Sequence, residues 1–167
     1  EEMLRYDKVH PCSPLGEHEH YVGGAAVMTC EVEGVRVTPV ICYDLRFPEL
    51  FRAAADNTDL FCVIANWPNL RSEAWTTLLT ARSIENQCWV AGVDRVGVGD
   101  GLDFEGGSML IDPSGGMVVS AGGDACVVSG DVSAEEVAQA RADLGFLSDR
   151  RADLFPEMES GPDSGRS

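Results

Sequence analysis

The order of apolar and polar residues along the chain predicts an α/β protein. Two continuous apolar runs, Leu60–Ala65 and Trp89–Val93, are bounded by polar residues, and this pattern predicts strands buried on both faces. Between them, apolar side chains recur at helical spacing over Ser72–Asn86, which predicts a long helix. Because strands and helices alternate here, we expect a mixed sheet with its helices on one face.

Further elements flank this central unit. Glu33-Gly34 separates two β-prone runs and predicts a hairpin, and a capping box of Ser133 and Glu136 predicts a helix that ends near Leu144. The remaining predicted elements are strands at Leu4–Val9, Ala26–Glu31, Val35–Ile41, Met109–Ile111, Met117–Ser120 and Ala125–Asp131, a helix at Pro48–Asp56 and a Gly-rich loop at Val96–Gly107.

We expect these elements to form one domain over residues 1–155. The tail over 156–167 is acidic and rich in glycine, proline and serine, and is predicted to be disordered. The sheet face without helices also needs apolar cover. A second sheet, from further chain or from a partner, is expected to supply it.

Charge and hydropathy exclude several classes of partner. The chain has 167 residues, of which 28 are acidic and 12 basic, for a formal net charge of −16. Such a surface repels phosphate backbones and anionic membranes, so we expect neither nucleic acid nor membrane as a partner. No apolar run is long enough to cross a bilayer, and no signal peptide is recognisable.

The six cysteines contain no C-x-x-C pair, so the sequence supports neither a zinc site nor a thioredoxin-like motif. We expect reduced thiols in the cytoplasm. Four of them stand in apolar stretches and are predicted to be buried: Cys30, Cys62, Cys88 and Cys126.

Cys42 is the candidate nucleophile. It ends a predicted buried strand, and ligands of α/β sheets bind beyond the carboxyl ends of strands. Backbone N–H groups after such a cysteine can hold an oxyanion. Lys8 would lower the pKa of the thiol if folding brings it beside the sulfur, and Glu17 is a candidate for part of the proton transfer. From the residues alone, surface or packing roles for all three stay open.

Neighbouring residues also allow more than one interpretation. Asp44, Arg46 and Glu49 could brace the turn after Cys42 by pairing with one another. Trp67 follows a strand end, and either lines a substrate pocket or belongs to the core. The Glu17–His20 stretch alternates acids and histidines, and an extended conformation would place both histidines on one face. A solvated loop is favoured there over a metal site.

Several motifs, in order and at matching spacing, resemble the nitrilase superfamily of carbon–nitrogen hydrolases. They are YDKVH at Tyr6–His10, ICYDLRFPE at Ile41–Glu49, NWP at Asn66–Pro68, ARSIENQ at Ala81–Gln87, FEGGS with IDP within Phe104–Pro113, and RADLF at Arg151–Phe155. The resemblance implies an α-β-β-α sandwich and a hydrolase that releases ammonia from a small amide through a cysteine thioester, without metal or cofactor. The NWP and Asn86-Gln87 regions look most like the omega-amidase branch.

The resemblance also implies roles for single residues. Lys8 matches the family's catalytic lysine, Cys42 its nucleophile, and Glu17 a second glutamate that positions the lysine. Tyr43 would lend its backbone N–H to the oxyanion hole, and Asn66-Trp67 would contact substrate. Relatives commonly form dimers, so a homodimer is implied.

The sequence departs from the family pattern at the general base. The family's first glutamate lies upstream of the lysine, so we expect an N-terminally incomplete chain with weak activity alone, because losing a general base costs roughly 10²–10⁴ in rate. An inactive remnant or interaction module of the same fold is the alternative function. Asp94 replaces the family's more usual asparagine, and little effect is expected.

Overall fold

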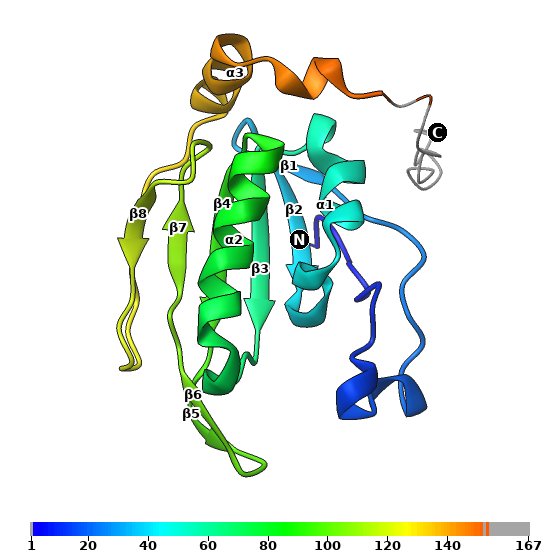
Figure 1. Ribbon diagram of the computed structural model, residues 1–167, viewed down its shortest axis with the longest axis vertical. Coiled ribbons are helices and arrows are strands. Elements are labelled where there is room, and N and C mark those ends of the chain that lie inside the picture. The colour runs from blue at the N-terminus through cyan, green and yellow to red at the C-terminus, as the bar shows by residue number, and fades with distance from the viewer. Residues whose placement is uncertain (1, 152, 154–167) are drawn as a thin grey trace.

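The computed structural model describes residues 2–151 and 153, and a mixed sheet forms its centre (Figure 1). In the described chain this sheet has six strands in the order β1-β2-β3-β4-β7-β8. The strands are β1 Cys30–Val32, β2 Val35–Ile41, β3 Leu60–Ala65, β4 Trp89–Asp94, β7 Met109–Ile111 and β8 Met117–Ser120. β2, β3 and β4 run parallel, so their carboxyl ends meet at one edge of the sheet.

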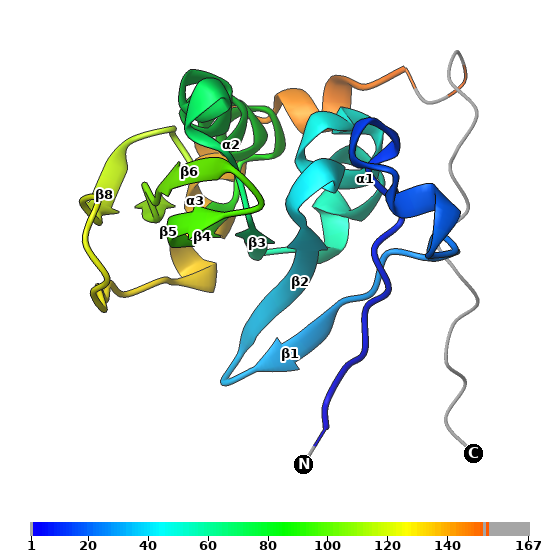
Figure 2. The ribbon, with the colours of Figure 1, turned by 90° about the horizontal axis from the view of Figure 1, so that it is seen from below.

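Two helices, α1 Pro48–Ala54 and α2 Ser72–Asn86, cover one face of the sheet (Figure 2). The helix α3, Ala134–Asp143, lies at the end of the sheet opposite the carboxyl ends of the parallel strands (Figure 1). Short 3-10 helices connect these elements: η1 Ser13–Leu15, η2 Glu17–Glu19, η3 Cys42–Arg46, η4 Ala55–Asn57, η5 Asn69–Arg71 and η6 Phe146–Asp149.

The main core lies between the sheet and α2. Phe61 and Val63 of β3 point into it, and Trp75 and Leu79 of α2 meet them, as the helical periodicity predicts. α2 approaches β4 so closely that a Cβ at Gly92 would collide with the side chains of Trp75 and Leu79. A glycine is therefore required at this position, and it fixes the depth at which α2 packs.

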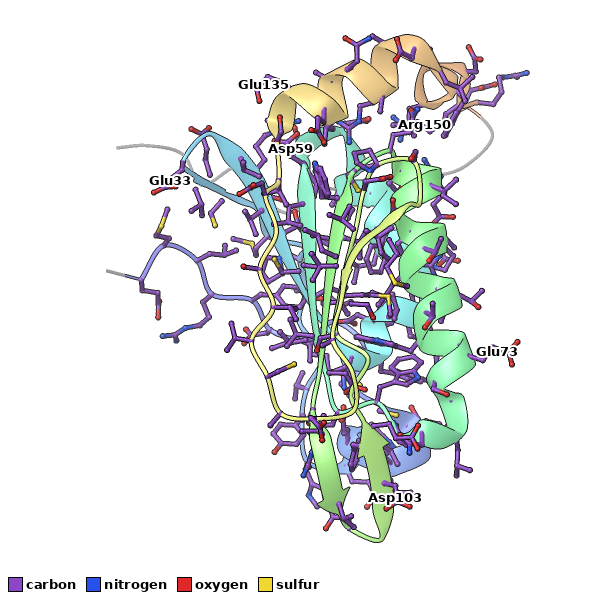
Figure 3. All side chains as sticks on the ribbon, turned by 90° about the vertical axis from the view of Figure 1, so that its left-hand side faces the viewer. Glu33, Asp59, Glu73, Asp103, Glu135 and Arg150 are labelled. Carbon is purple, nitrogen blue, oxygen red and sulfur yellow. The ribbon has the colours of Figure 1, made fainter. Side chains whose placement is uncertain are left out.

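The opposite face of the sheet is apolar and partly open. Ile64 and Val93 point to this face and are 54% and 53% exposed. Residues 121–132 cross part of it (Figure 3), where Gly130 lies against the side chains of Leu110 and Val119. The sequence-based expectation that this face needs further cover agrees with these exposures.

Three sequence predictions of local structure are wrong. Leu4–Val9 and Ala125–Asp131 are not strands, because neither segment enters a backbone ladder within the described residues. The Val96–Gly107 loop instead holds a hairpin of β5 Val96–Gly99 and β6 Leu102–Glu105. Its turn is Asp100-Gly101, with positive φ at both residues, which is the conformation that two-residue hairpin turns require.

Other predictions are confirmed at or near their boundaries. The Glu33-Gly34 turn has positive φ at both residues, and Ser133 Oγ caps α3 by accepting from Glu136 N. The strand predicted at Ala26–Glu31 is shorter than expected, since only Cys30–Val32 pairs with β2. The predicted disordered tail over 156–167 lies outside the described residues. Within the described part of the chain, no helix has the length and apolar character to cross a membrane.

Candidate active site

Cys42 stands at the carboxyl end of β2, where the chain turns into η3. Its φ is 47°, in the left-handed region that residues with a side chain seldom adopt. Holding a residue there costs of order 1–3 kcal/mol, so the surrounding contacts must impose the conformation. The residue is partly exposed, and the thiol lies 3.9 Å from the carbonyl oxygen of Asn66 at the end of β3.

Lys8 and Glu17 form a close ion pair, with Nζ and Oε2 2.6 Å apart. The same Oε2 accepts a hydrogen bond of 2.8 Å from Cys12 N. Burial opposes ionisation of Glu17, but the Cys12 N–H and the Lys8 ammonium outweigh it, so its pKa lies below the usual value. Glu17 is therefore a carboxylate at neutral pH, held by two donors and oriented toward the lysine.

The Cys42 thiol has a raised pKa. Burial is the main cause, and the Glu17 carboxylate adds to it, whereas the Lys8 ammonium and the hydrogen bond to Asn66 act in the opposite direction. The thiol is therefore protonated at neutral pH in this chain. To act as a nucleophile it needs a base to remove its proton.

Asp44 joins two segments, and the sequence did not predict this link. One is the Lys8 segment, Tyr6–His10, and the other is η3, Cys42–Arg46, called the nucleophile turn after the predicted role of Cys42. The Asp44 carboxylate is fully buried and accepts from Tyr6 Oη at 2.8 Å, His10 N at 2.8 Å and His10 Nδ1 at 2.9 Å. It also accepts from Ile41 N at 3.3 Å. Burial first, and then the Asp44 charge, raises the pKa of Tyr6, so the phenol stays a donor.

The predicted mutual pairing of Asp44, Arg46 and Glu49 is wrong. In residues 2–151 and 153, no ion pair joins any two of them. Arg46 instead stacks its guanidinium on the ring of Trp67, 4.6 Å from the centroid. Asp44 and Arg46 thus bind different neighbours instead of each other.

Trp67 belongs to the core. It is 4% exposed, contacts Trp75 at a ring separation of 5.5 Å, and donates from Nε1 to Arg71 O. The core interpretation is favoured by this burial, and substrate contact by Trp67 stays a prediction.

Asp94 has a larger role in the structure than the small effect expected from the sequence. Its Oδ1 accepts from Trp67 N at 2.7 Å and from Arg95 N at 2.9 Å, so it ties the ends of β3 and β4 together. Burial raises the pKa of Asp94 to about 6, against the opposing effect of those two N–H donors. An asparagine at this position would carry no such titration.

α2 contacts the nucleophile turn through Arg82. The sequence predicts a surface pair of Arg82 with Glu85, and the pair is present at 2.9 Å. However, Arg82 is only 4% exposed, and its Nε and Nη2 donate to Leu45 O within η3 at 3.2 and 2.8 Å. The arginine is therefore a buried link between α2 and the turn, rather than a surface residue.

The Glu17–His20 stretch does not adopt the extended conformation that the metal alternative requires. Glu17–Glu19 is a 3-10 helix, which separates the two histidines in direction. Across the described ranges 2–151 and 153, no group of three or more histidine, cysteine or acidic side chains is placed to hold a metal ion. Only Glu17 of this stretch reaches Lys8.

Among the other cysteines, Cys12 adds to the raised pKa of the Cys42 thiol. All six cysteines are free, Cys88 is buried, and Cys126 is exposed, contrary to its predicted burial, because its segment is not a strand. A hollow of about 440 Å³, lined in part by Arg36, Asp59 and Arg141, lies at the α3 end of the sheet.

The fold and this cluster define an α/β protein with a cysteine site at the carboxyl edge of its parallel strands. The chain belongs to the carbon–nitrogen hydrolase family, whose model matches residues 2–142. This confirms the family that the sequence motifs indicate.

Relatives of known structure and name agree with this assignment. The omega-amidase YafV of Yersinia enterocolitica is 44% identical over 135 residues, which cover 80% of this chain and 52% of that protein. A CN-hydrolase superfamily protein from Xanthomonas campestris, with an arsenic adduct in its active site, is 40% identical with a TM-score of 0.82, covering 87% of this chain and 58% of that one.

A third relative bears on the chemistry of the family. An amidase mutant from Nesterenkonia, which carries the acetamide moiety of fluoroacetamide on its active-site cysteine, is 29% identical with a TM-score of 0.78. The match covers 92% of this chain and 56% of that protein. The chain spans about half the length of these curated relatives.

Proposed function

We propose that this chain carries the nucleophile of an amidase that releases ammonia from small ω-amides. The observation that carries the proposal is the grouping of Lys8, Glu17 and Cys42 at the carboxyl edge of the parallel strands, where the Lys8 charge acts on the thiol. Similarity to omega-amidases supports the substrate class.

The reaction begins with loss of the Cys42 proton to a general base. Glu17 is a poor candidate, because its carboxylate is already occupied by Lys8 and Cys12 N and its pKa is lowered. The family pattern assigns this task to a glutamate upstream of the lysine. Glu17 instead orients Lys8 through their ion pair.

The thiolate then attacks the amide carbon, and the carbonyl electron pair moves onto oxygen. Lys8 stabilises this oxyanion together with the backbone N–H of Tyr43, since the first N–H groups of a helix lack partners within it. The oxyanion collapses, the C–N bond breaks, and the amine takes the proton from the base and leaves as ammonia. A thioester remains on Cys42.

Water completes the cycle. The same base removes a proton from water, hydroxide adds to the thioester carbon, and the thiolate leaves and is reprotonated. The products are a carboxylic acid and free Cys42. The two half-reactions balance with water as the second substrate.

The proposal is tested by ammonia release from a panel of small ω-amides. The 167-residue chain and a version extended upstream are assayed, each as wild type and as Cys42→Ala. We expect release by the extended chain that falls at least 10³-fold in Cys42→Ala. Cys126→Ala, at an exposed free thiol outside the Lys8, Glu17 and Cys42 group, is the control and should leave the rate unchanged. Turnover that survives Cys42→Ala would refute the proposal.

A further inference from the structure

Asp44 binds residues that precede and follow Lys8 in the chain. Its two oxygens accept four hydrogen bonds, three from Tyr6 and His10 and one from Ile41 N. Tyr6 and His10 are the residues two before and two after Lys8. These bonds therefore anchor the chain on each side of Lys8 and limit the directions in which the lysine can project.

The same carboxylate also acts on the nucleophile turn. Ile41 immediately precedes Cys42, and its N–H is bound by Asp44 Oδ2. Cys42 has the strained φ of 47°, which needs an external constraint. Stacking of His10 on Phe47, with ring centroids 3.7 Å apart, closes the connection on the far side of η3.

The Lys8 segment depends on such a constraint because it is not held by the sheet. Within the described chain it belongs to no strand, and Lys8 O accepts one backbone bond, from Gly24 N at 2.8 Å. Gly23 and Gly24 pass so close that a Cβ on either would collide with the backbone of Val9 or Asp7. This contact sets the depth of the segment, and Asp44 is left to set its orientation.

We propose that Asp44 is a positioning residue, which aligns the Lys8 ammonium with the Cys42 sulfur by binding both of their segments. This inference rests on the proposed function of the Lys8 and Cys42 pair, and it adds a residue outside the Glu-Lys-Cys set. Asp44 acts through Tyr6, His10 and Ile41, so it makes no contact with substrate.

The Asp44→Asn variant tests this role because it changes one atom. An amide oxygen can accept from only one side of the network, and the amide NH₂ faces donors on the other side. Two predictions for the thiol then have opposite signs. Loss of a negative charge alone would lower the pKa of Cys42, whereas a displaced Lys8 would raise it.

The measurement is the pH profile of Cys42 alkylation by iodoacetamide on the 167-residue chain, resolved by peptide mass spectrometry. The titratable groups that act on the thiol are Lys8, Glu17 and Cys12. We expect Asp44→Asn to shift the profile to higher pH and to slow alkylation at pH 7.5 by about three- to tenfold, in the direction of Lys8→Met.

Asp59→Asn is the matched control. Asp59 is also a buried carboxylate and accepts from Arg36, but it lies near the α3 end of the sheet (Figure 3). Its profile should equal that of the wild type. If Asp44→Asn does not fold, Tyr6→Phe removes one donor without changing charge, and a smaller shift of the same sign is expected.

The outcomes separate this inference from the proposed function. Suppose that Lys8→Met shifts the pH profile of alkylation. A wild-type profile for Asp44→Asn, or for Tyr6→Phe if Asp44→Asn does not fold, then overturns the role of Asp44. A shift to lower pH overturns it as well. A wild-type profile for Lys8→Met overturns both, because the lysine then has no effect on the thiol.

Discussion

The backbone of Cys42 and the side chain of Asp94 show how single residues at this site are held in unfavourable states. Cys42 has a positive φ of 47°, and Asp94 is a buried carboxylate without a cationic side chain bonded to it among the described residues. Both lie at the carboxyl ends of parallel strands. The Cys42 thiol contacts the carbonyl of Asn66, just after β3. Asp94 accepts from Trp67 N, also after β3, and from its neighbour Arg95 N. Strain at such positions is typical of functional sites.

Asp94 predicts a specific pH dependence of stability. Its pKa is about 6 in the folded chain and 3.8 in the reference state, so the folded state binds the proton more tightly. The contribution of Asp94 to the free energy of unfolding should therefore rise as pH falls from about 7 toward 4. Asp94→Asn lacks this titration and should be more stable than the wild type at pH 7.5, by about 1–3 kcal/mol.

Urea unfolding of wild type and Asp94→Asn between pH 4 and 8 measures this contribution. Other carboxylates, such as Glu17 and Asp59, have lowered pKa values and lose their contribution as pH falls, but they cancel in the difference between the two proteins. The stability advantage of Asp94→Asn should shrink as pH falls. An advantage that is constant over this range would contradict the raised pKa.

At the scale of elements, α2 is held to the nucleophile turn by a buried arginine. Arg82 donates twice to Leu45 O in η3, and its guanidinium lies over the ring of Phe51 in α1, 5.2 Å from the centroid. The helix spacing predicts the Arg82–Glu85 pair but not this burial. Arg82 is buried because η3 and α1, which are distant from it in sequence, pack against α2.

This contact predicts unequal effects of the two partners of the pair. Arg82→Met removes both bonds to Leu45 O and leaves a buried acceptor unpaired, so we expect a loss of about 2–3 kcal/mol in the free energy of unfolding. Glu85→Gln changes a partly exposed partner and should cost less than about 1 kcal/mol. Equal and small losses in denaturant titrations would support the surface pair instead.

Elements were predictable where local pattern decides them. β3, α2, β7 and β8 begin and end where the sequence predicts, because apolar periodicity and turn residues act over short distances. The strand predicted at Leu4–Val9 is absent because a β-prone composition does not by itself supply a neighbouring strand to pair with. Cys42, Lys8 and Glu17 were candidates from residue type and position, and the family motifs gave each a predicted role. The Asp44 bonds to Tyr6 and His10 span 38 and 34 residues, which no local pattern encodes.

At the scale of the whole molecule, the two faces of the sheet differ in burial. Val63 and Ile64 are neighbours in β3 that point to opposite faces, and they are 0% and 54% exposed. The face under the helices forms a buried hydrophobic core, and the opposite face is only partly covered by residues 121–132 (Figure 2). This asymmetry fits a sandwich in which a second sheet covers the open face.

The asymmetry predicts different costs for two adjacent truncations in the 167-residue chain. Val63→Ala creates a cavity in the core and should cost about 2–3 kcal/mol. Ile64→Ala removes a half-exposed side chain and should cost less than about 1 kcal/mol, with reduced binding of a hydrophobic dye. Thermal and urea unfolding measure both variants. A large cost for Ile64→Ala would show that the open face is covered in solution.

Acylation of Cys42 during turnover is the step on which the proposed function depends, and mass spectrometry of an acid-quenched reaction detects it. The upstream-extended chain is mixed with a small ω-amide, quenched while ammonia is being released, and digested. We expect the mass of the acyl group on the Cys42 peptide, and its loss after treatment with hydroxylamine. Ammonia release with an unmodified Cys42 peptide, or with the acyl group on another residue, would contradict it.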